Sequence, residues 1–465
     1  YRDDVMLRLW ILRRVLKSFR AVSRVSLWFE TRFTPLGRLL CTGSVAAAIF
    51  GLDPNQTVAL QLASLLFAAL AIAIIMSVRW RPQLETSRLI PDTVTVDVLT
   101  NYSITIKNLG QRAEIGLTLA DCLSTRYPDV DDFRRTARTR GQSGTNWFDR
   151  RVGFPRWLSL VRKSQGARLE TLSVQTIPSG SSVTLTVPLR PTRRGKIVFT
   201  AIELRRPDPL GVFFAKYKDK QYGELVSLPK RYPIPPLSWI SERHFHRGGL
   251  ALATTVGDSE EFIGLREYRP GDPLRHIHWR SFAKRGAPVI KEHQDEYFDR
   301  HALLIDTFLD DADPADFETV ISIAASFIQS ERPSDSILDL VFIEEKVWRL
   351  TTGRGLSNTR QILLQLADLQ PTASDDFSAV TAYLERYLDR LASVILVDTT
   401  WDSRRQEFVD ELQSRNLRCL ALIAQDPARS SPRSEEASPQ PNTVRPAYIA
   451  EDIAGITQSI ARSAT

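Results

Sequence analysis

Residues 260–285 have the sequence EEFIGLREYRPGDPLRHIHWRSFAKR and separate a β-rich stretch from an α/β stretch. The Pro-Gly pair at positions 270–271 suits a type II turn, because proline fixes φ and glycine accepts a positive φ. Asp272 is then placed to cap a helix whose first residue is Pro273, and Gly286 is placed to end it. A turn followed by a short helix is therefore predicted here.

The predicted helix carries apolar side chains on one side and cations on the other. We expect Trp279 to belong to a core, and Lys284 and Arg285 to bind a partner at the exposed end of the helix. The side expected to face the body of the protein carries Leu274, Ile277, Ser281 and Phe282.

Carboxylates and histidines in the same stretch leave alternatives open. Glu260, Glu261, Glu267 and Asp272 suit a salt-bridge network that fastens two domains, which we favour over acid/base catalysis. A metal pair from His276 and His278 is disfavoured, because these residues diverge by about 200° on a helix. The residues expected to bind a partner or fasten the junction are Arg266, Arg269, Gly271, Asp272, Arg275, His278, Trp279, Arg280, Lys284 and Arg285.

Beyond residue 300, apolar strands alternate with amphipathic helices. Runs such as ALLID at 302–306 and SVILVD at 393–398 have the length and composition of buried strands, and a helix is expected from Pro314 to Gln329. The alternation predicts a mostly parallel, doubly wound sheet. Residues 426–446 hold five prolines and four serines and are expected to form a flexible loop before a last helix.

Residues 88–230 consist of short β-branched runs separated by turn signals, such as YSITIKNLG at 102–110 and SSVTLTVPL at 181–189. Apolar and polar positions alternate within these runs. This alternation predicts an antiparallel β-sandwich of the immunoglobulin-like type.

A basic stretch at 124–168 interrupts the β-rich pattern. It has eleven Arg and Lys residues against four acidic ones, and it contains Trp147, Phe148, Phe154 and Trp157. Cations interleaved with aromatic rings suit an anionic membrane or single-stranded nucleic acid. A long solvated loop is the alternative, which we weigh equally with membrane contact and above nucleic acid.

A membrane hairpin is predicted at residues 35–80. Positions 54–78 hold 25 uncharged residues, and about 20 suffice to cross the hydrocarbon core. The preceding uncharged run at 39–52 has only 14 residues, so a second span is expected with a re-entrant segment as its rival. Cations flank the hairpin on both sides and Asp53 is the only charge between, which predicts two cytoplasmic termini and a mainly cytoplasmic chain.

The first 34 residues form a basic segment ahead of the hairpin. Apolar residues recur at spacings of three or four among the cations, which is typical of an amphipathic helix on an anionic leaflet. A solvated basic helix is the alternative. The apolar positions are Leu9, Leu12, Leu16, Phe19 and Val22.

Length and composition exclude several classes of protein. The 465 residues suggest about three folded units, and 43% hydrophobic with 25% charged residues excludes wholesale disorder. Cys41, Cys122 and Cys419 are too few and too scattered for a disulfide framework. The net charge of +7 is concentrated near the N-terminus and at 124–168, so it is not a nucleic-acid signature of the whole chain.

The run GLREYRPGDPLRHIHWRSFAKRG at 264–286, the strand PVIKEHQDEY at 288–297 and the phrase DPLGVF at 208–213 closely resemble the signature of the domain-of-unknown-function 58 family. The resemblance implies a membrane hairpin, a β-rich segment, a signature region at 240–300 and a von Willebrand factor A-like domain at 301–465. It also implies MoxR-type AAA+ ATPases and other von Willebrand factor A proteins as partners, because their genes commonly lie beside those of the family.

The fold family holds a metal at the carboxyl ends of its strands with an Asp-x-Ser-x-Ser motif. Here Phe308 and Asp310 stand at the two serine positions after Asp306, and only Asp306, Asp310 and Asp398 offer carboxylate oxygens. Phenylalanine cannot ligate a metal. We therefore expect no metal at this site and interpret Asp306 and Asp398 as caps at strand ends.

No phosphate-binding glycine loop, GxSxG or HExxH motif is present in the sequence. The favoured function is a membrane-anchored scaffold or adaptor that binds a MoxR-type ATPase in complex assembly or envelope maintenance, with no cofactor, no nucleic acid and an anionic membrane surface as a further partner. A metal-dependent or hydrolytic enzyme using Asp272, His278 and Asp306 is the alternative.

Overall fold

The computed structural model divides into two compact units, Tyr1–Lys230 with Leu364–Asp368, and Arg231–Leu363 with Leu369–Thr465. It describes residues 2–50, 57–130, 132–133, 153–234, 262–270, 274, 277–293, 299–308, 314–330, 336–343, 347–353, 358–372, 377–386, 388–415, 417–424 and 447–448. The predicted loop at 426–446, nearly all of the predicted last helix and Trp147 and Phe148 lie outside these residues.

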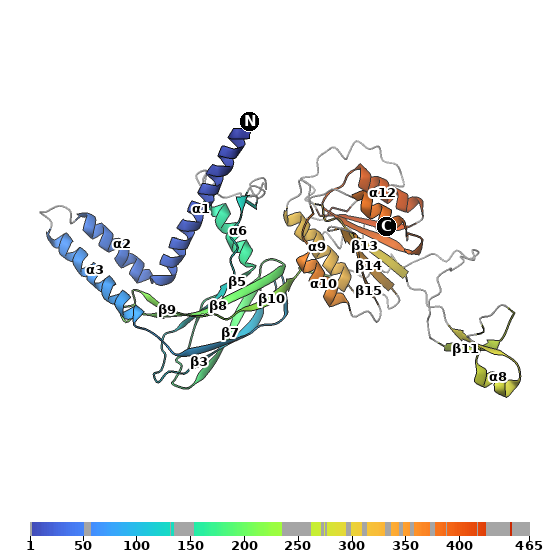
Figure 1. The fold of residues 1–465 in the computed structure, drawn as a ribbon, viewed down its shortest axis with the longest axis horizontal. Coiled ribbons are helices and arrows are strands. Elements are labelled where there is room, and N and C mark those ends of the chain that lie inside the picture. The colour runs from blue at the N-terminus through green and yellow to red at the C-terminus, as the bar shows by residue number, and fades with distance from the viewer. Residues whose placement is uncertain are drawn as a thin grey trace. The chain divides into compact units, whose positions relative to one another are not determined.

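Three helices open the first unit: α1 (Arg2–Arg32), α2 (Pro35–Phe50) and α3 (Thr57–Val78) (Figure 1). Within the described residues, α3 is the one helix that is long and apolar enough to cross a membrane, and most of its large side chains are exposed. The apolar α2 has 16 residues and a length of about 24 Å, short of a hydrocarbon core of about 30 Å. Crossing by α2 stays a prediction.

The β-rich part of the first unit is a sandwich of two sheets. One has the strand order β1-β3-β7-β5, and the other has the order β2-β10-β8-β4-β6 with β9 on β8. All pairs are antiparallel except β2 with β10, which is parallel. The strands are β1 (Leu84–Leu89), β2 (Thr93–Thr95), β3 (Thr100–Asn108), β4 (Thr118–Leu123), β5 (Ala167–Leu169), β6 (Leu172–Ser173), β7 (Ser182–Pro191), β8 (Gly195–Pro207), β9 (Phe214–Asp219) and β10 (Gly223–Leu228).

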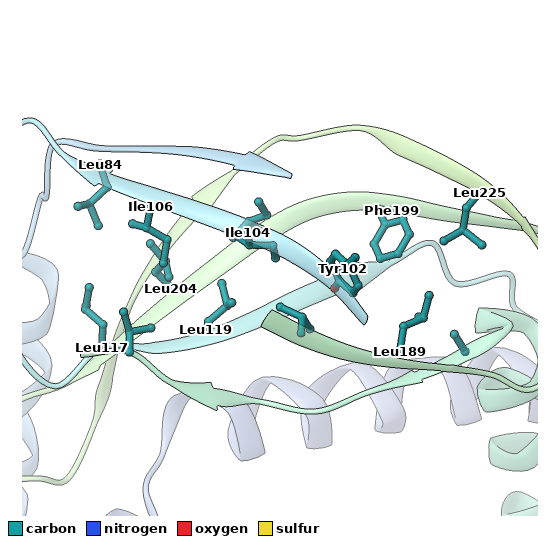
Figure 2. Packing of buried hydrophobic residues seen from close by; sticks show 14 of the residues in the cluster. Leu84, Tyr102, Ile104, Ile106, Leu117, Leu119, Leu189, Phe199, Leu204 and Leu225 are labelled. Atoms are coloured by element: carbon teal, nitrogen blue, oxygen red, sulfur yellow. The ribbon is translucent and has the colours of Figure 1, made fainter. Parts of the chain in front are cut away.

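Alternate residues of both sheets fill the space between them. Ile104 and Ile106 from β3 belong to the same buried hydrophobic cluster as Phe199 and Leu204 from β8 (Figure 2). A buried ion pair crosses the same space, because Arg88 on β1 contacts Asp121 on β4 at 2.5 Å. The sandwich is thus confirmed, while its immunoglobulin-like type stays a prediction.

The described part of the basic stretch between β4 and β5 includes helix α6 (Phe154–Gln165), which packs against α1. Trp157 is 1% exposed and lies 6.2 Å from the ring of Phe19 on α1. Leu16 and Phe19 are buried in the same cluster, so they do not face lipid as the sequence pattern suggested. The described aromatic residues of the basic stretch form a core rather than a lipid or nucleic-acid surface.

The turn between β8 and β9 has the sequence DPLGVF and is held by Asp208. Its Oδ1 accepts the backbone N–H groups of Val212 at 2.7 Å and Phe213 at 2.6 Å, and its Oδ2 accepts that of Leu210 at 3.0 Å. Gly211 has φ +67°, which favours glycine. The carboxylate therefore fixes the shape of a turn that presents its backbone outward.

This turn is the docking point for the corner between α1 and α2. The Thr34 hydroxyl donates to the Gly211 carbonyl at 2.6 Å, and the Phe33 ring packs edge-on against Phe213 with centroids 5.0 Å apart. Gly37 lies so close that a Cβ would stand 1.9 Å from the Val212 carbonyl oxygen. The hydrophobic cluster here includes Ala73 of α3, so both apolar helices are joined to the sandwich at this corner.

Alanine at Gly37 should loosen this corner and lower the melting temperature of the detergent-solubilised protein, because overpacking costs about 1 to 3 kcal/mol. Gly43→Ala on the same helix is the matched control, since a Cβ there meets nothing within 4 Å. Thermal unfolding of both variants checks this. Equal melting temperatures for the two would contradict the close contact.

The second unit contains a six-stranded sheet with the order β15-β14-β13-β16-β17-β18, in which only β15 is antiparallel to its neighbour. This confirms the predicted mostly parallel sheet. Its elements are β13 (Asp299–Ile305), α9 (Pro314–Gln329), β14 (Ser336–Ile343), β15 (Val347–Gly353), α10 (Thr359–Asp368), α11 (Phe377–Glu385), η2 (Leu388–Arg390), β16 (Ser393–Asp398), α12 (Ser403–Ser414), β17 (Arg418–Ile423) and β18 (Ala447–Tyr448).

Helices cover both faces of this sheet. Phe377 of α11 and Phe408 of α12 pack with Leu304 and Leu396 on one face. Leu303 points to the opposite face, where α9 contacts β13 and β16. Both central strands, β13 and β16, are therefore buried on their two faces, and their carboxyl ends meet at one edge of the sheet.

Candidate functional site

A buried cluster of one arginine and two aspartates lies at that edge. Asp306 follows β13, Asp398 ends β16, and Arg405 is in the first turn of α12. Arg405 Nη2 donates to Asp306 Oδ2 and its Nε donates to Asp398 Oδ2. Both aspartate side chains are fully buried and the arginine side chain is 6% exposed. One guanidinium thus joins the ends of two neighbouring strands.

The start of α12 positions this arginine. Asp402 caps the helix by accepting the backbone N–H of Arg405 at 2.9 Å, and its other oxygen accepts Nη1 of the same residue at 2.9 Å. The guanidinium lies 5.0 Å from the centroid of the Phe377 ring. Three carboxylates and one aromatic face therefore hold Arg405 in a single orientation.

Burial and the neighbouring charges shift the pKa values of Asp306 and Arg405. Burial, and then repulsion from Asp398, raise the pKa of Asp306 well above its usual range, while Arg405 opposes this shift. Burial alone would lower the pKa of Arg405, but Asp398 and Asp306 together raise it above its ordinary value. The arginine is therefore a permanent cation, and it is the group that allows both carboxylates to be buried.

The cluster does not fit a divalent metal. All four carboxylate oxygens already have donors, because Asp306 Oδ1 accepts the N–H of Phe308 at 2.8 Å and Asp398 Oδ1 accepts that of Thr400 at 2.9 Å. Phe308 itself is 4% exposed and belongs to the core. Arg405 lies where a metal ion would have to bind. Asp310, the third carboxylate considered from the sequence, lies outside the described residues.

The signature stretch forms a small module of its own. Strand β11 (Phe262–Glu267) pairs with β12 (Val289–His293), and α8 (Trp279–Arg285) lies between them in the chain. The His278 N–H donates to the Val289 carbonyl at 2.8 Å, and His278 Nδ1 is 2.7 Å from the Ser281 hydroxyl. Gly286 ends the helix with φ +68°, as predicted. The structure therefore places His278 in a local bond and does not join it to the Asp306 cluster.

Three expectations about this module were wrong. The helix begins at Trp279 rather than at Pro273, because Ile277 pairs with Ile290 in an isolated β-bridge. Trp279 is 64% exposed and is not a core residue. Of the side chains expected to face the body, Ile277 is buried, whereas Leu274 is 65% exposed and Phe282 is 37% exposed.

The exposed face of α8 combines aromatic and cationic groups. The rings of Trp279 and Phe282 meet edge to face at 6.1 Å, and Arg280 and Lys284 are exposed on the same short helix. Arg266 donates to the Glu267 carbonyl at 3.2 Å. The backbone of Gly271, Asp272, Arg275, Glu260, Glu261 and His276, and the side chain of Arg285, lie outside the described residues, so the predicted salt-bridge network stays a prediction.

Residues 264–430 match the family described as "Protein of unknown function DUF58". This part of the chain belongs to the DUF58 family. The match contains β13, α12 and the whole Asp306, Asp398 and Arg405 cluster. It also begins inside the signature module, so the resemblance drawn from residues 264–286 is confirmed.

The DUF58 region has a relative in Bacillus subtilis (strain 168), "Uncharacterized protein YeaD", which is 25% identical over 201 residues. The matched segment covers 42% of this chain and 48% of that protein, so the chain spans about half the length of this relative. Its name assigns no activity.

Two solved structures match parts of the chain. The CARDB domain of PF1109 from Pyrococcus furiosus is 15% identical, covers 30% of this chain and 94% of that one, and has a TM-score of 0.15. An aerotolerance-related membrane protein from Bacteroides fragilis is 10% identical, covers 36% of this chain and 88% of that one, and has a TM-score of 0.21. These scores support no conclusion about function.

Replacing Arg405 by leucine should destabilise the protein by about 3 to 5 kcal/mol, because two carboxylates would stay buried without a cation. Arg404→Leu, at the exposed neighbouring position, is the matched control. Thermal unfolding at neutral pH measures both. An Arg405 variant as stable as the control would contradict the role of the guanidinium.

The loss in Arg405→Leu should shrink at acid pH. Asp306 has a raised pKa in the folded protein, so the folded state binds its proton more tightly than the unfolded chain does. The stability that this tighter proton binding at Asp306 contributes is present at low pH, and it is lost as the pH rises from about 4 through the folded-state pKa of Asp306. Without Arg405 that pKa rises further. The difference in melting temperature between Arg405→Leu and wild type should therefore become smaller as the pH is lowered from about 8 to about 5. A difference that stays constant over this range would contradict the coupling between Arg405 and Asp306.

Millimolar Mg²⁺ or Mn²⁺ should leave the melting temperature of the wild-type protein unchanged, because a ligand that binds only the folded state must raise it. Arg405 and two backbone N–H groups already occupy the oxygens of Asp306 and Asp398. A rise of several degrees that disappears in Asp306→Ala would show that a metal displaces the arginine.

Proposed function

We propose that this protein is a membrane-anchored adaptor whose DUF58 region binds protein partners through the exposed face of α8. The partner class is a MoxR-type AAA+ ATPase together with other von Willebrand factor A proteins, and the sheet of the second unit is von Willebrand factor A-like. Anchoring through α3, with α2 as a second span and both termini in the cytoplasm, completes the proposal.

The single observation that carries it is the exposure of Trp279 within the family signature. A tryptophan that is 64% exposed beside Phe282, Arg280 and Lys284 contributes little to its own module. Tryptophan and arginine are the residue types that most often anchor protein interfaces. The strand order and the aspartates at the ends of β13 and β16 support the von Willebrand factor A-like assignment.

Trp279→Ala should leave thermal stability unchanged and reduce capture of a purified MoxR-type ATPase from the same organism by at least tenfold, because an interface anchor contributes about 2 kcal/mol or more. Arg280→Glu with Lys284→Glu should have the same effect if the partner surface is acidic. The measurement is binding to the immobilised, detergent-solubilised full chain.

Trp348→Ala is the matched control, since Trp348 on β15 is 40% exposed but lies outside the signature. It should bind the ATPase as the wild type does. Normal binding of the ATPase by Trp279→Ala would show that Trp279 is not an anchor of the interface. Unfolding of Trp279→Ala would show that Trp279 has a core role.

A further inference from the structure

Helix α1 has two faces with different surroundings. One face carries Leu12, Leu16, Phe19 and Ser23, which recur at spacings of three or four and point toward α6 or are buried. Arg20 flanks this face, with its guanidinium 4.5 Å from the centroid of the Tyr127 ring. Near its end, α1 also packs through Phe29 on the corner cluster with Phe33 and Phe213, so the middle of the opposite face is left out of both clusters.

The opposite face holds a stripe of Trp10, Arg14, Lys17, Arg24 and Trp28. With Ala21, these residues follow one another at spacings of four, three, four, three and four, so they lie on one side of the helix. Trp10 is 58% exposed and Trp28 is 54% exposed. The Arg14 guanidinium lies 5.6 Å from the centroid of the Trp10 ring. The stripe is thus cationic in the middle and aromatic at both ends.

We infer that this stripe lies on the headgroups of an anionic lipid leaflet. This inference rests on the membrane anchoring proposed above. No acidic residue occurs between Trp10 and Trp28, so the stripe is complementary to negative headgroups. Tryptophan is enriched at the level of the headgroups, where its ring meets the acyl boundary and its N–H meets water. The residues involved differ from the apolar positions that the sequence pattern favoured.

The connection to the hairpin keeps α1 next to the apolar helices. The helix ends at Arg32, and α2 begins at Pro35 after a corner fastened to the β8–β9 turn by Thr34. In the first unit, α6 lies on one side of α1 and the α2–α3 pair on the other (Figure 1). The stripe, which is opposite to the α6 face, is therefore turned toward the side from which the apolar helices extend.

The test uses the full chain with Cys41, Cys122 and Cys419 changed to serine, reconstituted in nanodiscs of phosphatidylcholine alone or of phosphatidylcholine mixed with phosphatidylglycerol. A polarity-sensitive fluorophore is attached at Ala21→Cys in the centre of the stripe, or at Ser26→Cys, an exposed position on the other side of α1, as the matched control. We expect a blue shift at position 21 only in the phosphatidylglycerol discs, and no shift at position 26.

Charge reversal of Arg14, Lys17 and Arg24 to Glu should abolish the shift, whereas reversal of three exposed cations of the sandwich, Lys107, Arg112 and Arg190, should not. If the protein stays bound to the nanodiscs but has the same emission at position 21 in both lipids, the contact of the stripe with anionic headgroups is contradicted, whereas the anchoring is not. Protein that leaves the discs altogether would overturn the anchoring. A shift caused by single-stranded DNA and not by phosphatidylglycerol would show that the stripe binds nucleic acid and not lipid.

Discussion

Two carboxylates buried at the ends of neighbouring parallel strands require a positive charge beside them, and Arg405 supplies it. The dehydration of Asp306 and Asp398 would otherwise cost more than the sheet edge could offset. Because the cation is covalently part of α12, the position of this helix on the sheet is tied to the ends of β13 and β16. The carboxyl ends of these two strands are thus closed by the chain itself.

A second constraint operates in the first unit. Asp208 shapes the DPLGVF turn, and this turn receives the corner between α1 and α2 with a fit that only glycine at position 37 allows. The apolar helices are therefore fastened to the β-sandwich by short polar contacts and by the edge-to-face contact of Phe33 with Phe213. The two parts of the family resemblance, the turn and the signature, have separate structural roles.

Periodicity in the sequence was enough to predict the strands and helices of the α/β sheet, because their apolar positions repeat regularly. The same periodicity contained the signal for Arg405, which lies three and four residues before the buried Phe408 and Val409 on the inner stripe of α12. Its partners could not be predicted, since pairing across 99 residues depends on the strand order. A charged residue on a buried helical stripe is the pattern that would have revealed it.

Two other features could not be predicted for different physical reasons. The apolar stripe with Leu16 and Phe19 has the same spacing whether it meets lipid or another helix, and only the fold shows that it meets α6. Trp279 looked like a core residue because of its size, but the β11–β12 module has too few strands to enclose it. Hydrophobicity alone does not distinguish a core from an interface.

The role of Arg405 as the built-in cation can be measured directly by anomalous X-ray diffraction from crystals of the full chain soaked in Mn²⁺. We expect the guanidinium between Asp306 and Asp398 and no anomalous peak there. A manganese peak between the two carboxylates, with the Arg405 side chain displaced, would contradict this role and restore a metal to the edge of the sheet.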